Sequence, residues 1–133
     1  MNNVAQTYTR LSLEGSSPVG LVVALYDNAL KSLYRARKAM EANDIERRTQ
    51  HLNHVLSIVA HLEGTLDLQE GGEVANTLKQ FYTYARSRIL EVSMTNSKTK
   101  LGDLVSHFSS LRAAWQVVES QVPEDLKARP GRA

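Results

Sequence analysis

Three of the four histidines in this 133-residue chain lie close together in the sequence, and histidine is a common ligand for metals. On a helix, His51, His54 and His61 would fall within about 80° of one another. His61 would nevertheless stand roughly 10 Å along the axis from His54, too far for both to bind one ion. Arg47 shares this stripe one turn before His51, where its fixed charge would repel a cation. We therefore interpret the histidines as a polar helix face and expect no metal centre and no cofactor.

A histidine on a helical bundle can also accept a phosphoryl group, and His61 is the candidate for that reaction. Histidine phosphotransfer domains carry an exposed histidine followed closely by Leu-Lys-Gly. Here His61 is followed by Leu62, Glu63 and Gly64, so glutamate stands where lysine would assist the phosphoryl group. Negative charge at that position opposes a phosphate. Phosphotransfer stays open as a disfavoured alternative.

Other signatures of catalysis are missing from the sequence. The chain contains no cysteine, so it has no thiol nucleophile and no disulfide, which fits a reducing compartment. No glycine-rich loop follows a strand-like segment, and no serine has the context of a nucleophile elbow. We therefore expect a protein that is not an enzyme.

Composition narrows the class of protein further. Hydrophobic residues make up 42% of the chain and charged residues 23%, as in ordinary globular domains. The formal net charge is only +2 and the two signs are interleaved, which argues against a nucleic-acid binder. No apolar run approaches the roughly 20 residues that span a bilayer. We expect a cytoplasmic protein without stable membrane insertion.

Four amphipathic segments account for most of the chain, since apolar residues recur at steps of three and four between helix breakers. The breakers are Ser17-Pro18, Asn43-Asp44, Gly71-Gly72, Thr95-Asn96-Ser97 and Val122-Pro123. The apolar positions are Val22, Tyr26, Ala29, Leu33, Ala36 and Met40 in the first segment; Leu52, Val55, Val59, Leu62 and Leu66 in the second; Val74, Leu78, Phe81, Ala85, Ile89 and Val92 in the third; and Leu101, Leu104, Phe108, Leu111, Trp115, Val118 and Val122 in the fourth.

Short connections between long helices favour antiparallel neighbours. The pattern therefore predicts an all-α fold, an antiparallel up-down-up-down four-helix bundle over residues 17–122. Val4, Tyr8 and Leu11 share one face of a short helix that would be unstable alone. Residues 1–16 are thus predicted to form a short N-terminal amphipathic segment packed on the bundle, and residues 123–133 a flexible tail.

The aromatic residues divide into two predicted groups. Phe108 and Trp115 fall on the most regular apolar stripe and are expected in the core. Tyr26, Tyr82 and Tyr84 suit the rim of a groove, because a tyrosine hydroxyl must be wet or paired. A bundle of this kind without catalytic groups points to recognition of another helix-forming chain.

Several short motifs, in order, are similar to those of a known family. They are Tyr8, Leu11-Ser12-Leu13-Glu14, Ser17-Pro18, Leu25-Tyr26-Asp27, Leu66-Asp67, Gly71-Gly72-Glu73, Tyr82-Thr83-Tyr84, Arg88, Ile89-Leu90-Glu91, Leu111 and Ala114-Trp115. Over residues 5–120 the chain resembles the flagellin-specific secretion chaperones of the FliS family.

The resemblance implies a partner and a site. The partner would be the disordered C-terminal segment of flagellin, held monomeric in the bacterial cytoplasm until delivery to the flagellar type III export gate. The expected client groove is lined by Tyr8, Tyr26, Ile58, Leu62, Leu66 and Tyr82. For Leu62 and Leu66, core packing is at least as plausible a role. A generic helical adaptor remains the alternative to this function.

Overall fold

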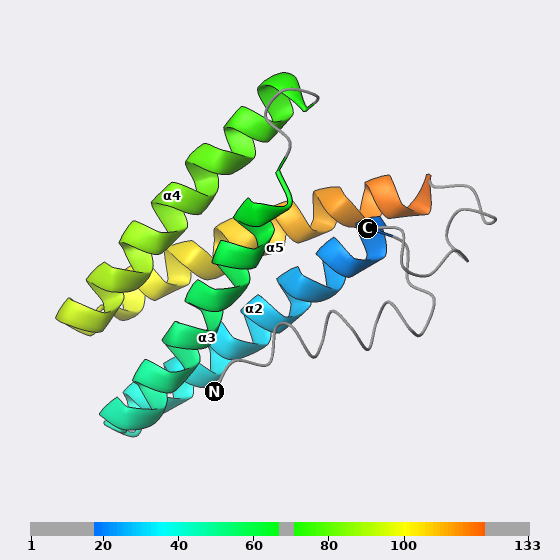
Figure 1. Cartoon of the computed structure of the whole chain (residues 1–133). Coiled ribbons are helices and arrows are strands. Elements are labelled where there is room, and N and C mark those ends of the chain that lie inside the picture. Colours follow the sequence, from blue (N-terminus) through cyan, green and yellow to red (C-terminus); the bar gives the residue numbers. More distant parts are fainter. Residues whose placement is uncertain (1–17, 67–70, 122–133) are drawn as a thin grey trace.

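The computed structural model describes residues 18–66 and 71–121, which form four α-helices and no strand. The helices are α2 (Pro18–Glu41), α3 (Ile45–Gly64), α4 (Gly72–Thr95) and α5 (Lys98–Ser120), shown in Figure 1. The all-α prediction is confirmed. The predicted N-terminal segment 1–16 and tail 123–133 lie outside the described residues.

Two of the helices begin with a side-chain cap, each at a break predicted from the sequence. Asp44 Oδ1 accepts a hydrogen bond of 3.1 Å from the backbone N–H of Arg47 at the start of α3. Ser97 Oγ accepts one of 3.1 Å from the N–H of Lys100 at the start of α5. Each cap satisfies a backbone donor that has no partner within the helix. Asn96, with φ of 56°, takes the left-handed conformation that ends α4.

The Gly71-Gly72 pair has a different role from the one predicted. The pattern placed these glycines at the end of the second helix, but α3 already ends at Gly64. Its last turn is closed by Thr65, whose Oγ1 donates a hydrogen bond of 2.7 Å to the carbonyl oxygen of Leu62. Gly72 does adopt a positive φ of 55°, but it is the first residue of α4. The glycine conformation was anticipated, and its position relative to the helices was wrong.

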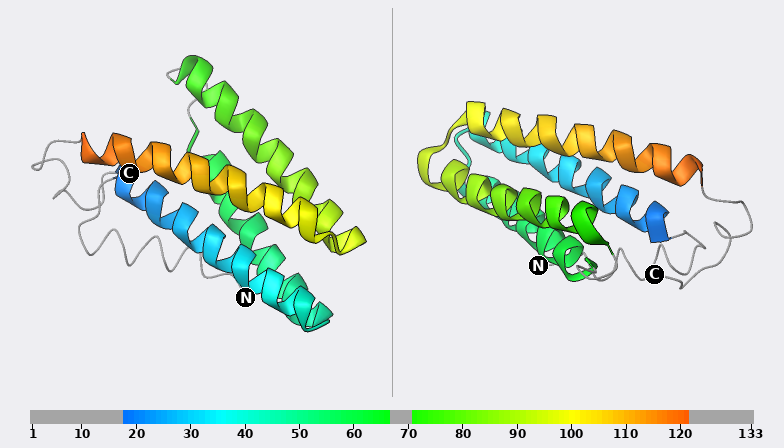
Figure 2. Two further views of the ribbon diagram at one scale, coloured as in Figure 1. Left: turned by 180° about the vertical axis from the view of Figure 1, so that it is seen from behind. Right: turned by 90° about the horizontal axis from the view of Figure 1, so that it is seen from above.

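The four helices form a square in which α2 packs against α3 and α5, and α4 packs against the same two helices. Sequential neighbours run antiparallel, so the predicted up-down-up-down order is confirmed (Figure 1). Figure 1 and the left view of Figure 2 show that α4 and α5 meet at their connecting turn and diverge toward the start of α4 and the end of α5. The axes of these two helices are therefore farther apart at that end.

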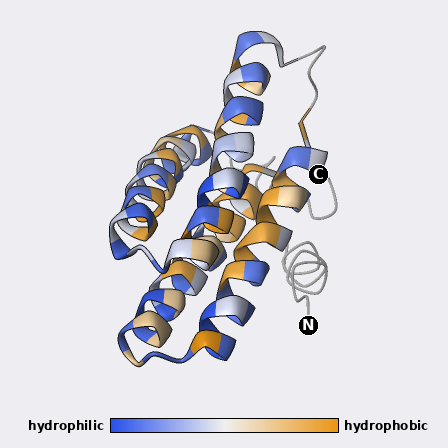
Figure 3. Ribbon diagram, turned by 90° about the vertical axis from the view of Figure 1, so that its left-hand side faces the viewer, coloured by the Kyte–Doolittle hydropathy of each residue, from blue (hydrophilic) through white to orange (hydrophobic). Residues whose placement is uncertain are grey.

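The interior is built from the predicted apolar stripes, and the helices are amphipathic along their length (Figure 3). The largest fully buried side chains are Tyr26, Tyr82, Phe108, Leu25, Leu33, Leu52, Ile58, Leu62, Ile89, Leu101, Leu104 and Val55. Two stripe ends were predicted incorrectly. Val74 is 67% exposed, because Ala75 and Leu78 face the core in the first turns of α4. Val118, in the last turn of α5, is 43% exposed.

Candidate functional site

Four of the six residues predicted to line a client groove lie in the interior of the bundle. Tyr26, Ile58, Leu62 and Tyr82 are at most 1% exposed, so in this conformation they belong to the core beneath any surface groove. Leu66 is half-buried and packs against that core. Tyr8 lies outside the described residues.

Tyr26 and Tyr82 are buried because their hydroxyl groups satisfy each other. Tyr26 of α2 and Tyr82 of α4 lie on diagonally opposite helices, and their Oη atoms are 2.8 Å apart. Burial raises the pKa of both phenols, and the hydrogen bond raises that of Tyr82 while lowering that of Tyr26. Either hydroxyl can be the donor. The expectation that these rings form a groove rim was wrong, since a hydroxyl paired inside the bundle does not need water.

A row of aromatic and apolar side chains, half-buried except for one exposed histidine, lies over this pair between α4 and α5. We call it the α4–α5 face and define it by Phe81, Tyr84, His107, Leu111 and Trp115. The Phe81 ring packs edge-on against the buried Phe108 ring at 5.3 Å between centroids. His107 stacks edge-on against Tyr84 at 5.3 Å and lies 6.2 Å from Phe81, which places this side of α5 against α4.

The side of α5 that belongs to the α4–α5 face continues toward the end of this helix. Leu111 and Val118 follow His107 by four and eleven residues, so all three fall on one side of the helix. Trp115 packs against the core, and its interaction with the Tyr26 hydroxyl lowers the pKa of Tyr26. The prediction that Phe108 is a core residue is confirmed. Trp115, also predicted in the core, is only partly buried and packs against the core from its edge.

The other end of the α4–α5 seam is polar. Arg88 lies over the Tyr84 ring, 5.2 Å from its centroid, and its Nε donates to the Tyr84 hydroxyl at 3.3 Å. Lys100 of α5 is 2.7 Å from a carboxylate oxygen of Glu91 in α4. Hydrogen bonding to Lys100 lowers the pKa of Glu91, so this carboxylate is charged at neutral pH. The α4–α5 face is thus open at one end and held by charge pairs at the other.

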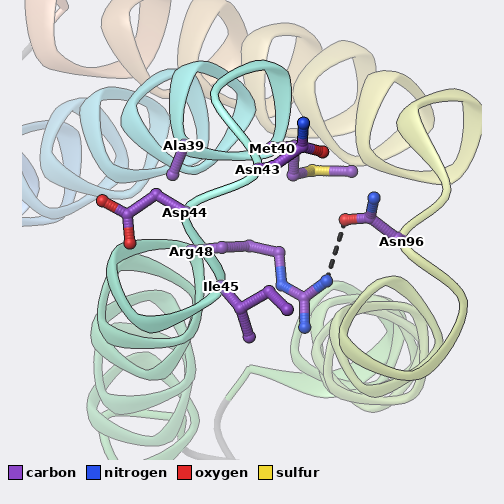
Figure 4. Close-up of a pocket in the computed structure, with 7 residues that line it drawn as sticks. All are labelled: Ala39, Met40, Asn43, Asp44, Ile45, Arg48 and Asn96. Atoms are coloured by element: carbon purple, nitrogen blue, oxygen red, sulfur yellow. Dashed lines mark hydrogen bonds between the residues drawn. The ribbon is translucent and has the colours of Figure 1, made fainter.

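A small pocket beside the α2–α3 turn has a structural role (Figure 4). Its volume is about 180 Å³. Arg48 of α3 enters it and donates hydrogen bonds of 2.8 Å to Asn96 Oδ1 and 3.0 Å to the Ser93 carbonyl oxygen. Because Arg48 thereby ties the start of α3 to the end of α4, we regard this pocket as a joint between two turns.

The histidines do not form a metal site. His51 and His54 have pKa values lowered first by burial, with Arg35 adding electrostatic repulsion to both. His61 is half-buried further along α3. Among the residues that the structure describes, no three His, Cys, Asp or Glu side chains gather closely enough to hold an ion. None of the described helices is long and apolar enough to cross a membrane.

The α4–α5 face was missed at the sequence level, although part of its signal was present. Three aromatic residues fall within four positions at Phe81, Tyr82 and Tyr84, so they cannot all point into one core. His107 shares its side of the helix with Leu111, which marks that side as the edge of the apolar stripe. What the pattern could not supply is the divergence of the two helices.

Comparison with known proteins gives a consistent result. A family model described as "Flagellar protein FliS" matches residues 1–122. The chain is 28% identical over 118 residues to the flagellar secretion chaperone FliS of Salmonella typhimurium, covering 85% of this chain and 87% of that protein. It is 29% identical over 120 residues to the Campylobacter jejuni chaperone of the same name, covering 90% and 94%. It is 25% identical over 122 residues to that of Bacillus subtilis, covering 91% and 90%.

Proposed function

The chain belongs to the FliS family of flagellar secretion chaperones, and from this membership we propose that its client is the C-terminal segment of flagellin. The chaperone binds this disordered segment in the bacterial cytoplasm and prevents premature polymerisation. It then delivers the subunit to the flagellar type III export gate. The family is not enzymatic. Membership in it argues against the two alternative functions, a generic helical adaptor and a histidine phosphotransfer domain.

The observation that carries this proposal is the exposed apolar character of the α4–α5 face. Phe81, Leu111 and Trp115 are only half-buried, and Val118 beyond them is 43% exposed. A flagellin segment that forms helices in the filament has an apolar side, and burying it against these side chains would stabilise the complex. Ordering a disordered client costs roughly 2–5 kcal/mol of the gross interaction energy, which keeps the complex releasable.

The residues first predicted as groove walls support this face from below. Tyr26 and Tyr82 lie in the core beneath Phe81 and Trp115, and the Phe81 and Tyr82 rings are in contact at 5.6 Å between centroids. Their proposed role is to set the shape of the face. Ile58 and Leu62 are buried in the core and would affect client binding only through packing. A direct contact between either residue and the client would require the bundle to open.

Calorimetry with a synthetic flagellin C-terminal peptide tests the proposal. Phe81→Ala removes a ring from the face and is expected to weaken binding roughly tenfold, equivalent to about 1.4 kcal/mol. Leu90→Ala is the matched control, because Leu90 is 54% exposed on the same helix and lies outside the face. We expect it to change affinity less than about twofold. Absence of binding by the unaltered chain would refute flagellin as the client, whereas equal losses in both variants would refute the α4–α5 face as its site.

A second experiment concerns residues 1–16, which were predicted to pack on the bundle and which include Tyr8 of the expected client groove. A segment tethered at high effective concentration competes with the client. Deleting residues 1–16 should therefore tighten binding of the flagellin peptide and increase self-association, measured by calorimetry and light scattering. No change in either quantity would mean that the segment is passive. Loss of binding in a folded truncated protein would mean that Tyr8 contacts the client itself.

A further inference from the structure

Positive charge gathers on the opposite side of the bundle, along the seam between α2 and α3. Arg35 and Lys38 of α2 face Arg47 and His51 of α3 across a surface hollow of about 500 Å³. We call these four residues the basic seam. The other residues that line the hollow are Ala39, Ala42 and Asp44, so only one carboxylate faces four basic groups.

The cations of the basic seam are paired less well than those at other seams. Three cations at other seams pair with a carboxylate on a neighbouring helix: Arg86 with Glu63, Lys100 with Glu91, and Arg112 with Asp27. Within the described residues, Arg35 and Lys38 form no ion pair. Arg47 is 3.6 Å from Asp44, but its side chain is 75% exposed and Asp44 also caps α3. Arg35 and Lys38 are like charges three residues apart on one helix, a spacing that destabilises the helix slightly.

The charged groups around His51 also show this excess of positive charge in their effect on the His51 pKa. Its pKa is lowered by burial first, then by Arg35 and by Arg47, and only Asp44 acts in the opposite direction. Lys38 also faces the hollow from α2. His51 is therefore neutral at neutral pH. An anion bound in the hollow would offset the two arginines and favour protonation of His51.

We propose that the basic seam is a docking surface for an acidic α-helical segment of a protein partner, separate from the α4–α5 face. Arg47 and His51 lie one helical turn apart, about 6 Å along the axis, and Arg35 and Lys38 about 4.5 Å apart. Packed helices lie about 8–10 Å apart. Carboxylates at i and i+4 on a helix seated between α2 and α3 match these spacings.

A protein partner fits this surface better than a nucleic acid or a small anion does. Single-stranded nucleic acids use aromatic side chains as stacking platforms, and none lines the hollow. A small anion needs buried donors fixed around it, whereas Arg35, Lys38 and Arg47 are all exposed. Several exposed cations suit a partner that presents several carboxylates together.

The test uses the full chain and a labelled helical peptide that carries glutamate pairs at i and i+4, with the same peptide bearing glutamine as control. Fluorescence anisotropy at low salt should detect binding of the glutamate peptide only. The variant Arg35→Gln/Arg47→Gln should weaken this binding roughly tenfold. The matched variant Arg37→Gln/Lys79→Gln removes the same charge from exposed sites outside the basic seam and should change affinity less than about twofold.

Proton linkage adds an independent readout. Affinity for the glutamate peptide should increase as pH falls from about 7.5 to about 6, because binding favours the charged form of His51. His51→Gln should remove this increase, with circular dichroism confirming that the bundle is intact. Equal losses in the two double variants would overturn the proposal, because binding would then depend on net charge alone. Tighter binding of a single-stranded oligonucleotide of matched charge would also overturn it in favour of nucleic acid.

Discussion

The buried tyrosine pair allows a quantitative test of how this bundle is held together. Tyr26 and Tyr82 are 0% and 1% exposed, and their hydroxyl oxygens lie 2.8 Å apart. Either hydroxyl can be the donor of this hydrogen bond, and each phenol has the other as its partner inside the bundle. Replacing either tyrosine by phenylalanine preserves the ring and removes only a hydroxyl.

Each single substitution leaves the other hydroxyl buried without its partner, which costs about 1–3 kcal/mol of unfolding free energy. The double variant leaves neither phenol unpaired and should cost about 1 kcal/mol. With about 2 kcal/mol for each single variant, the expected coupling between the two sites is roughly 3 kcal/mol.

Urea unfolding of the four proteins, followed by far-UV circular dichroism, completes this double-mutant cycle. Additive costs would refute the reasoning, because they would mean that the two hydroxyl groups do not depend on each other.

High pH gives a second view of the same pair. Burial raises the pKa of both tyrosines in the folded state, so the unfolded chain loses these protons first, near pH 10. The stabilisation is complete below about pH 10 and declines above it by about 1.4 kcal/mol per pH unit for each tyrosine. The double phenylalanine variant lacks this decline, so its unfolding free energy should exceed that of the unaltered chain near pH 11. Parallel curves for the two proteins would refute the burial of the hydroxyls.

Three further predictions follow from burial, capping and charge. Trp115→Ala should cost only about 1–2 kcal/mol in urea unfolding because the ring is half-buried, whereas Phe108→Ala, at a fully buried position, should cost about 3–5 kcal/mol. Asp44→Ala and Ser97→Ala should each lower thermal stability by about 1 kcal/mol through loss of a helix cap, and a change below a few tenths would contradict the observed caps. Arg112→Ala should cost at most about 1 kcal/mol at low salt, and less at high salt, because its ion pair with Asp27 is partly exposed.

Much of the fold could be predicted from short-range patterns. The breaks at Asn43-Asp44 and Thr95-Asn96-Ser97 depend on caps that reach three residues along the chain, so they can be identified directly from local sequence. The four apolar stripes needed only a period of three to four residues, which is also local. Gly71-Gly72 shows the limit of this reasoning, since a left-handed glycine marks a turn without indicating which of the two flanking helices contains it.

The candidate site needed information that is not local. Tyr26 and Tyr82 stand 56 residues apart, and only their pairing across the bundle makes burial of two phenols favourable. Trp115 has the spacing of a core residue, but it packs against the core only from its edge. The basic seam likewise combines residues from two helices whose facing sides are set by packing.

By itself, therefore, the sequence determined the helical class, the register of most apolar stripes, the caps and the family resemblance. Tertiary structure alone decided which aromatic rings are enclosed, where the α4–α5 face opens and which cations gather between α2 and α3. The physical reason is that helix periodicity and capping arise from interactions within a turn. Burial and charge clustering depend on the packing of helices distant in the sequence, and the local pattern does not specify that packing.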